Sequence, residues 1–228
     1  VGTALLPLLS KQIREGNHEK ANATQIHAIE LALFLSLPAA IAIIAIARPI
    51  ISVMFERGAF TALDTQATTP ALVAFAMGLP AFILIKILAP CFYANQDTKT
   101  PFKIATICIL VNLFFNLALM GYFRHVGMAL ATSIAAWVNV MLMFVSLRKR
   151  DWIRIDPVLK CDVAKILFAC AVMVWVLAFG EALAHDWLIG QQWQRFTSLI
   201  LLSVAGGVTY IAASWALNPI AIRTKMNR

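Results

Sequence analysis

Four polar side chains lie inside apolar stretches of the chain, and their chemical types suit the binding of ions. Lys86 lies in the run FILIKILAP, and Asn112, Asn116 and Thr132 lie on the two apolar stretches that follow. Polar groups are costly in apolar surroundings and usually face a cavity or a partner helix. An ammonium group can hold an anionic substrate, whereas amide and hydroxyl oxygens are ligands that hard cations prefer. The sequence therefore suggests two kinds of chemistry, one for an anion and one for a cation.

The amides of Asn112 and Asn116 are four residues apart, so both lie on one face of a helix. A short loop at Arg124 and His125 folds the next stretch back, which places Thr132 at about the depth of Asn116. One interpretation is an oxygen-lined Na⁺ site completed by backbone carbonyls. The other is that these groups join two helices by hydrogen bonds. No carboxylate of this chain reaches that depth, so a Na⁺ site would need one from elsewhere.

Lys86 lies thirteen residues before Lys99, which is about 20 Å along a helix. A lysine side chain cannot reach the polar boundary over that distance. The ammonium group is therefore expected to face water, an anion or a cluster of acceptors. An anionic substrate in a central cavity is one interpretation. The alternative is pairing with backbone carbonyls that Pro80 or Pro90 leaves without a donor.

These residues belong to six apolar stretches, each long enough for a helix to cross the ~30 Å hydrocarbon core of a bilayer. The chain of 228 residues is 61% hydrophobic and 13% charged, which is too apolar for a water-soluble domain. An all-α, polytopic transmembrane helix bundle is therefore predicted. The first span is expected to break at Arg48 and Pro49, and residues 1–9 are interpreted as the end of a further, truncated span. The six spans are predicted at residues 26–55, 68–94, 104–123, 126–147, 163–183 and 196–222.

Lys and Arg residues are distributed unevenly between alternate loops, which predicts how the spans are oriented. One set of alternate loops holds fourteen of the nineteen Lys and Arg residues. The other set holds only Arg57, Arg124 and Arg195, and two more basic residues fall inside spans. Loops rich in Lys and Arg remain on the cytoplasmic side of a membrane. The C-terminus is therefore expected in the cytoplasm, and the net charge of +8 indicates topology with no nucleic-acid partner. The fourteen residues of the basic set lie within residues 11–20, 99–103, 148–165 and 223–228.

No sequence motif of an enzyme or of a metal centre is found. The four cysteines lack CxxC spacing, and the four histidines are isolated from one another. A P-loop and a GxSxG motif are also absent. We therefore expect no catalytic residues, no resident cofactor and no enzymatic activity.

Three strings in the polar segments resemble one known family. They are LLPLLSKQIREGN at residues 5–17, FERGAFTALDTQ at residues 55–66 and APCFYANQDTKTPFK at residues 89–103. Together they are similar to the lipid II flippase family (MurJ, also called MviN) of the multidrug/oligosaccharidyl-lipid/polysaccharide exporter superfamily. The resemblance covers essentially the whole chain.

The resemblance implies a protein of fourteen helices with both ends in the cytoplasm. Residues 1–150 would then be the end of helix eight and helices nine to twelve of the C-terminal transporter lobe. Residues 151–228 would be the two additional helices, thirteen and fourteen, which help to form a lipid-accommodating groove. The family moves lipid II, a lipid-linked peptidoglycan precursor, from the inner to the outer leaflet of the bacterial inner membrane by alternating access. This transport serves cell-wall synthesis and makes or breaks no bond.

The resemblance also suggests roles for particular residues. Lys86 would add positive potential near a cationic cavity that holds the pyrophosphate. The loop residues Glu56, Arg57 and Gly58 would shape the outer gate. Some members bind Na⁺, a possible coupling ion, and the positions matching that site are Asn112, Asn116 and Thr132. Where the site can use an Asp, this chain has Asn116, and the carboxylate of helix seven lies outside the chain.

Other functions are also compatible with these patterns. A related exporter would move another lipid-linked glycan or a drug. A membrane scaffold for cell-wall assembly would need no substrate path. The expected partners are lipid II, membrane lipids and, for either function, the cell-wall synthesis machinery.

Overall fold

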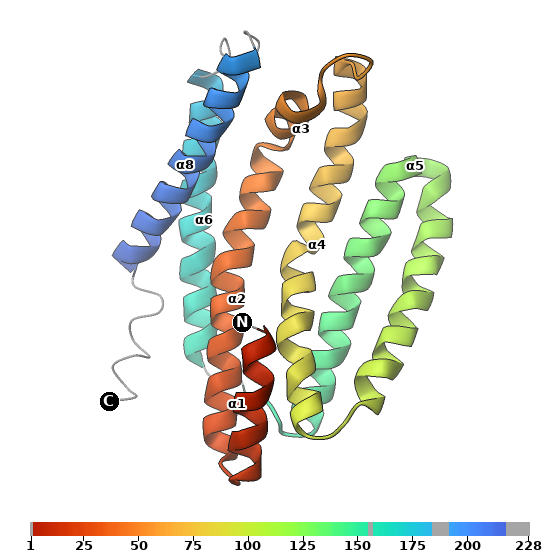
Figure 1. Ribbon diagram of the computed structural model, residues 1–228, viewed down its shortest axis with the longest axis vertical. Coiled ribbons are helices and arrows are strands. Elements are labelled where there is room, and N and C mark those ends of the chain that lie inside the picture. The colour runs from red at the N-terminus through yellow and green to blue at the C-terminus, as the bar shows by residue number, and fades with distance from the viewer. Residues whose placement is uncertain (1, 155–156, 184–191, 218–228) are drawn as a thin grey trace. The chain divides into compact units, whose positions relative to one another are not determined.

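The computed structural model describes residues 2–154, 157–183 and 192–217, and Figure 1 shows that these ranges are almost entirely helical. Within them there is no strand, so the predicted all-α fold is confirmed. Five of the helices are long and apolar enough to cross a membrane. The helices are α1 (Gly2–Arg14), α2 (His18–Ala45), α3 (Ala47–Phe55), α4 (Ala62–Ala94), α5 (Lys99–Lys149), α6 (Pro157–Leu183) and α8 (Gln192–Leu217).

The chain packs as two compact units, each made of two segments. The first unit contains residues 1–36 and 78–160, and the second contains residues 37–77 and 161–228. All three boundaries fall inside helices: beside Pro38 in α2, at Gly78 in α4 and after residue 160 in α6. A proline inside a helix removes one backbone donor and weakens the helix there. The division at residue 150, which came from the family resemblance, concerns the helices of relatives and stays a prediction.

The first predicted span consists of two helices, α2 and α3. The sequence placed the break at Arg48 and Pro49, whereas the structure shows it at Ile46, with φ −111° and ψ 28°. The ring of a proline clashes with the carbonyl four residues earlier. For Pro49 that carbonyl belongs to Ala45, the last residue of α2. The proline therefore causes the break, but the backbone changes direction three residues before it.

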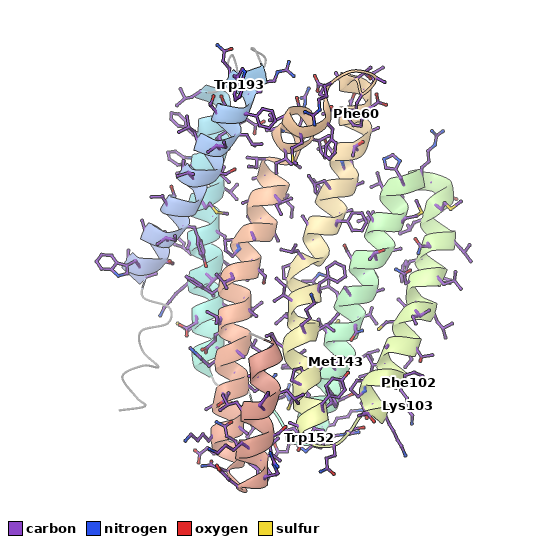
Figure 2. All side chains as sticks on the ribbon, viewed as in Figure 1. Phe60, Phe102, Lys103, Met143, Trp152 and Trp193 are labelled. Carbon is purple, nitrogen blue, oxygen red and sulfur yellow. The ribbon has the colours of Figure 1, made fainter. Side chains whose placement is uncertain are left out.

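The third and fourth predicted spans are the two arms of α5, which fold into a hairpin (Figure 1). The turn occurs at Arg124, where φ is +49° and ψ is −126°. Phe102 and Met143, from opposite arms, lie at the same end of the hairpin in Figure 2. A Cβ atom on Gly127 would lie 2.6 Å from the carbonyl oxygen of Leu119. The tight turn therefore requires glycine at this position, and the predicted hairpin is confirmed.

In the second unit, α6 and α8 lie side by side (Figure 1) and pack through glycines. A Cβ atom on Gly180 of α6 would lie 2.9 Å from Leu202 of α8. A Cβ atom on Gly206 of α8 would likewise lie 2.9 Å from Leu177 of α6. Each helix therefore receives a leucine of the other. The last residues of the predicted sixth span, 218–222, and the basic C-terminal residues lie outside the described residues.

Candidate functional site

Lys86 lies on the exposed face of α4, within the first unit. The next two residues, Ile87 and Leu88, are 3% and 1% exposed and form the opposite, buried face of the helix. Among the described residues Lys86 makes no ion pair and no side-chain hydrogen bond, so the predicted pairing with carbonyls near Pro80 or Pro90 is not seen. An ammonium group within an apolar helix is therefore available to a ligand.

The structure brings together Asn112, Asn116 and Thr132 across the two arms of α5. Asn116 Nδ2 donates to Asn112 Oδ1 at 2.8 Å, and Asn112 Nδ2 donates to Thr132 Oγ1 at 3.4 Å. The Thr132 hydroxyl in turn donates to the carbonyl of Met128 at 2.9 Å. The sequence placed Thr132 level with Asn116, whereas its partner is Asn112, one helical turn away. The arms are therefore joined by hydrogen bonds, as one of the two interpretations proposed.

Two buried amide oxygens near this network accept no hydrogen bond. They belong to Asn116 and Asn139. In the described part of the chain there is no group of three His, Cys, Asp or Glu side chains that could hold a metal. A cation at this position would therefore be bound by neutral oxygens only, and the Na⁺ site stays a prediction.

The loop between α3 and α4 is held by Glu56. Its Oε2 accepts a hydrogen bond from the Thr65 hydroxyl at 3.0 Å, and its Oε1 lies 3.6 Å from Arg195 Nη1 of α8. Both charged side chains are only 24% exposed. All three residues belong to the second unit. The sequence missed Arg195, although it is one of the three basic residues of the loops poor in Lys and Arg.

The other two predicted gate residues differ from Glu56. Arg57 is exposed and forms no ion pair with any residue that the structure describes. Gly58 has a φ of +61°, a region that L side chains rarely adopt. The turn is closed by a hydrogen bond from Phe60 N to Arg57 O at 3.2 Å. Glycine therefore shapes the loop here, and the role of the loop as a gate stays a prediction.

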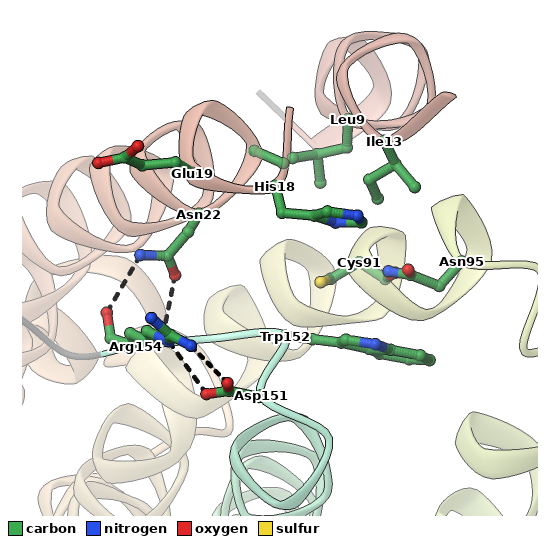
Figure 3. Close-up of a pocket in the computed structure, with 11 residues that line it drawn as sticks. Leu9, Ile13, His18, Glu19, Asn22, Cys91, Asn95, Asp151, Trp152 and Arg154 are labelled. Carbon is green, nitrogen blue, oxygen red and sulfur yellow. Dashed lines mark hydrogen bonds and ion pairs between the residues drawn. The ribbon is translucent and has the colours of Figure 1, made fainter. Parts of the chain in front are cut away.

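A pocket of about 500 Å³ in the first unit was not predicted (Figure 3). Its walls come from α1, the start of α2, the end of α4 and residues 151–154. Asn22 fixes the backbone of Arg154, accepting from its N–H at 2.9 Å and donating to its carbonyl at 3.3 Å. Arg154 also forms a two-pronged ion pair with Asp151, at 3.0 and 2.5 Å. The contacts of Asn22 with Arg154 join residues more than a hundred positions apart, so no local sequence pattern predicts them.

Beside this pocket, Asp97 joins the start of α5 to the residue that follows its end. Its carboxylate accepts from the backbone N–H of Thr100 at 3.0 Å and pairs with Arg150, which also donates to Thr100 Oγ1 at 2.7 Å. The hydrogen bonds from Thr100, followed by those from Arg150, lower the pKa of Asp97 to about 2. This charge pair fastens the two ends of the hairpin.

Comparison with known proteins identifies one family. The family model described as "Lipid II flippase MurJ" matches residues 1–197. A "Probable lipid II flippase MurJ" of Rickettsia prowazekii is 46% identical over 93% of this chain and 41% of its own length. One of Rhizobium tropici is 37% identical over 93% of this chain and 40% of its own length. A solved structure, "Lipid II flippase MurJ, inward closed conformation", superposes with a TM-score of 0.77 at 26% identity, over 97% of this chain and 43% of its own. The chain thus spans about two fifths of these relatives.

Proposed function

Because the chain belongs to the lipid II flippase MurJ family, we propose that it is part of a transporter that moves lipid II across a bacterial inner membrane. The relatives that carry this name extend over almost the entire chain, and the fold matches a solved flippase. Their names favour lipid II over another lipid-linked glycan or a drug as the substrate. Transport from the inner to the outer leaflet requires no bond to be made, so no enzymatic step is assigned.

The chain is a multi-pass membrane protein, and its orientation is part of this proposal. The loops rich in Lys and Arg, together with the C-terminus, would face the cytoplasm. The loop with Glu56 and Arg57 would then face the outside, and Lys86 would lie within the membrane. The prolines inside α2 and α4 would let these helices bend as the transporter alternates between its two open states.

The observation that supports substrate binding most directly is the unpaired ammonium group of Lys86. A pyrophosphate carries several negative charges, and an ion pair is stronger in a low-dielectric cavity than in water. Lys86 would therefore attract the headgroup while the polyprenyl tail remains among lipids. A lysine held only for packing would be paired or would reach the interface.

A complementation experiment tests this role. The full-length protein is expressed in a strain depleted of its flippase. With Lys86→Ala its rate of lipid II transport is expected to fall at least about tenfold, whereas Lys86→Arg should retain most of the rate. Lys103→Ala is the matched control, because this lysine is exposed at the start of α5. Normal growth and transport with Lys86→Ala would show that Lys86 has no part in the substrate path.

A second part of the proposal is that Asn112, Asn116 and Thr132 bind Na⁺ as a coupling ion. The buried, unpaired oxygen of Asn116 supports it, because such an oxygen is ready to accept a ligand. Transport is then expected to be faster in sodium chloride than in choline chloride. Asn116→Asp adds a carboxylate and should enlarge that difference. Equal rates in both salts for both proteins would exclude Na⁺ coupling at this site.

Finally, Glu56, Arg57 and Gly58 are proposed to shape an outer gate. The contacts of Glu56 with Thr65 and Arg195 support this role, since they join the loop to α4 and α8. Glu56→Gln should slow lipid II transport more than Arg57→Gln, because only Glu56 is anchored. The opposite order, measured by transport in the full-length protein, would count against an anchored gate.

A further inference from the structure

The pocket of the first unit is held open by contacts on three sides. Gln12 of α1 donates to Thr24 of α2 at 3.1 Å. Gln25 of α2 donates to the carbonyl of Ile87 in α4 at 2.9 Å. Asn22 holds the backbone of Arg154, as described above. A volume of about 500 Å³ lies within the range of small-molecule sites. The pocket is therefore preformed and large enough for a ligand.

The charges of the pocket differ from those around it. Its lining includes Glu19 and Asp151 but a single basic residue that is always charged, Arg154, so the net charge is one negative with a neutral histidine. Asp151 is already paired with Arg154, whereas Glu19 has no ion pair among the described residues. Two basic residues outside the lining flank the turn between α1 and α2: Arg14 is the last residue of α1, and Lys20 lies in the first turn of α2. A ligand that fits has a cationic group inside and an anionic group at the rim.

Aromatic and amide groups add acceptors for a cation. In Figure 3 the rings of His18 and Trp152 lie on opposite sides of the pocket, both seen nearly edge-on. The Trp152 ring packs against the ring of Phe92, with centroids 6.1 Å apart and an angle of 70° between the ring planes. Indole rings attract ammonium groups. The Arg150 guanidinium lies 4.8 Å from the centroid of this ring and occupies one of its faces, so a ligand ammonium would contact the other. Asn95 Nδ2 donates to the Cys91 carbonyl at 2.8 Å, which leaves its Oδ1 free to accept.

The pocket also lies at the depth of lipid headgroups. His18 is the first residue of α2, and Asn95 follows the last residue of α4, and both helices are long and apolar enough to span a bilayer. The ends of spanning helices meet the headgroup region. Leu9 and Ile13 of α1 supply an apolar wall next to the polar groups. A ligand with both a charged head and an apolar body matches this arrangement.

From these observations we infer that the pocket binds the aminoethyl phosphate headgroup of phosphatidylethanolamine, in the leaflet that faces the basic loops. Glu19 and Asn95 accept hydrogen bonds from the ammonium, which lies against the face of the Trp152 ring that Arg150 leaves open. The phosphate lies at the rim, near Lys20 and Arg154, and the glycerol end contacts Leu9. This lipid site is separate from the residues proposed for the transported substrate.

Competitive lipid binding tests this assignment. The full-length protein in detergent is mixed with equal amounts of phosphatidylethanolamine and phosphatidylglycerol, and native mass spectrometry counts the bound lipids. The wild type is expected to retain phosphatidylethanolamine preferentially. Glu19→Gln should reduce that preference about threefold, which is the size of an exposed ion pair, and Glu19→Lys should abolish it. Equal retention of both lipids by the wild type would overturn the inference.

A matched control and a soluble competitor make the result specific. Glu15→Gln is the same chemical change in a residue outside the pocket lining, and it should leave the preference unchanged. Soluble phosphoethanolamine, at the concentration of the lipid, should displace little of it. If soluble phosphoethanolamine displaced the bound phosphatidylethanolamine as completely as an equal amount of added phosphatidylethanolamine does, the ligand would be a free metabolite and the assignment to a lipid would be overturned. Because the readout is lipid binding, this test is independent of the outcome for Lys86 and transport.

Discussion

Lys86 in α4 and the amides of α5 are polar groups within apolar helices, but they differ in whether they have hydrogen-bond partners. The amides of Asn112 and Asn116 bind each other and Thr132, whereas the ammonium of Lys86 binds no residue that the structure describes. A neutral amide at membrane depth gains about 0.6 kcal/mol from one interhelical hydrogen bond. A charge there costs a few kcal/mol more, and a ligand or water must compensate for it. Amides can therefore serve packing alone, but an unpaired lysine indicates function.

The largest effect is expected on lipid II transport, when the charge of Lys86 is reversed. With Lys86→Glu in the full-length protein, we expect lipid II transport to fall below that of the Ala variant, because a carboxylate repels a pyrophosphate. Transport in depleted cells measures the effect, and the amount of protein in the membrane serves as the control for folding. Transport equal to that of Lys86→Ala would mean that the substrate never approaches this residue.

A larger residue at Gly78 tests how closely α4 must approach α5. A Cβ atom there would lie 2.5 Å from Ser133 Oγ and 3.0 Å from Ser133 Cα. Gly78→Val is therefore expected to destabilise the fold by about 1–3 kcal/mol, the usual cost of overpacking. Thermal unfolding in detergent measures it, with Gly207→Val as the control, because a Cβ atom on Gly207 meets no atom within 4 Å. Equal melting temperatures for both variants would contradict the close approach.

Removing Asn112 tests whether the amides stabilise the hairpin. Asn112→Leu deletes two hydrogen bonds and should cost about 1 kcal/mol. Asn139→Leu is the comparison, since the buried oxygen of Asn139 accepts no hydrogen bond and its loss should be neutral or stabilising. Chemical unfolding of both variants gives the two values. The reverse order of stability would show that the network does not join the arms.

The smallest effect is expected from a charge that is paired outside the spans. The pKa of Asp97 is lowered to about 2 in the folded protein, below its value in an unfolded chain. The hydrogen bonds that Asp97 accepts from Thr100, followed by its pairing with Arg150, therefore stabilise the fold above the unfolded pKa, and this stabilisation is lost as pH falls toward 2. The difference in melting temperature between wild type and Asp97→Asn should be at most a few degrees at pH 7 and shrink toward pH 2. A difference that grows on acidification would contradict the assignment.

The sequence predicted the elements and the polar residues of the spans well, because both depend on local patterns. Apolar stretches gave the spans, and the four-residue spacing placed Asn112 and Asn116 on one face. The hydrogen-bond partner of Thr132, which is Asn112 and not Asn116, depends on the geometry of the turn at Arg124 and Gly127, which local patterns do not encode. The ion pair of Glu56 with Arg195 joins residues far apart in sequence, and no periodicity encodes such a contact.

The reciprocal packing of α6 and α8 has a mechanical consequence. Leu202 occupies the space above Gly180, and Leu177 occupies the space above Gly206. Sliding one helix by a single turn, about 5.4 Å, would drive both leucines against side chains that have a Cβ atom. These two contacts oppose sliding in either direction, so α6 and α8 are expected to move together as one rigid body during any conformational cycle.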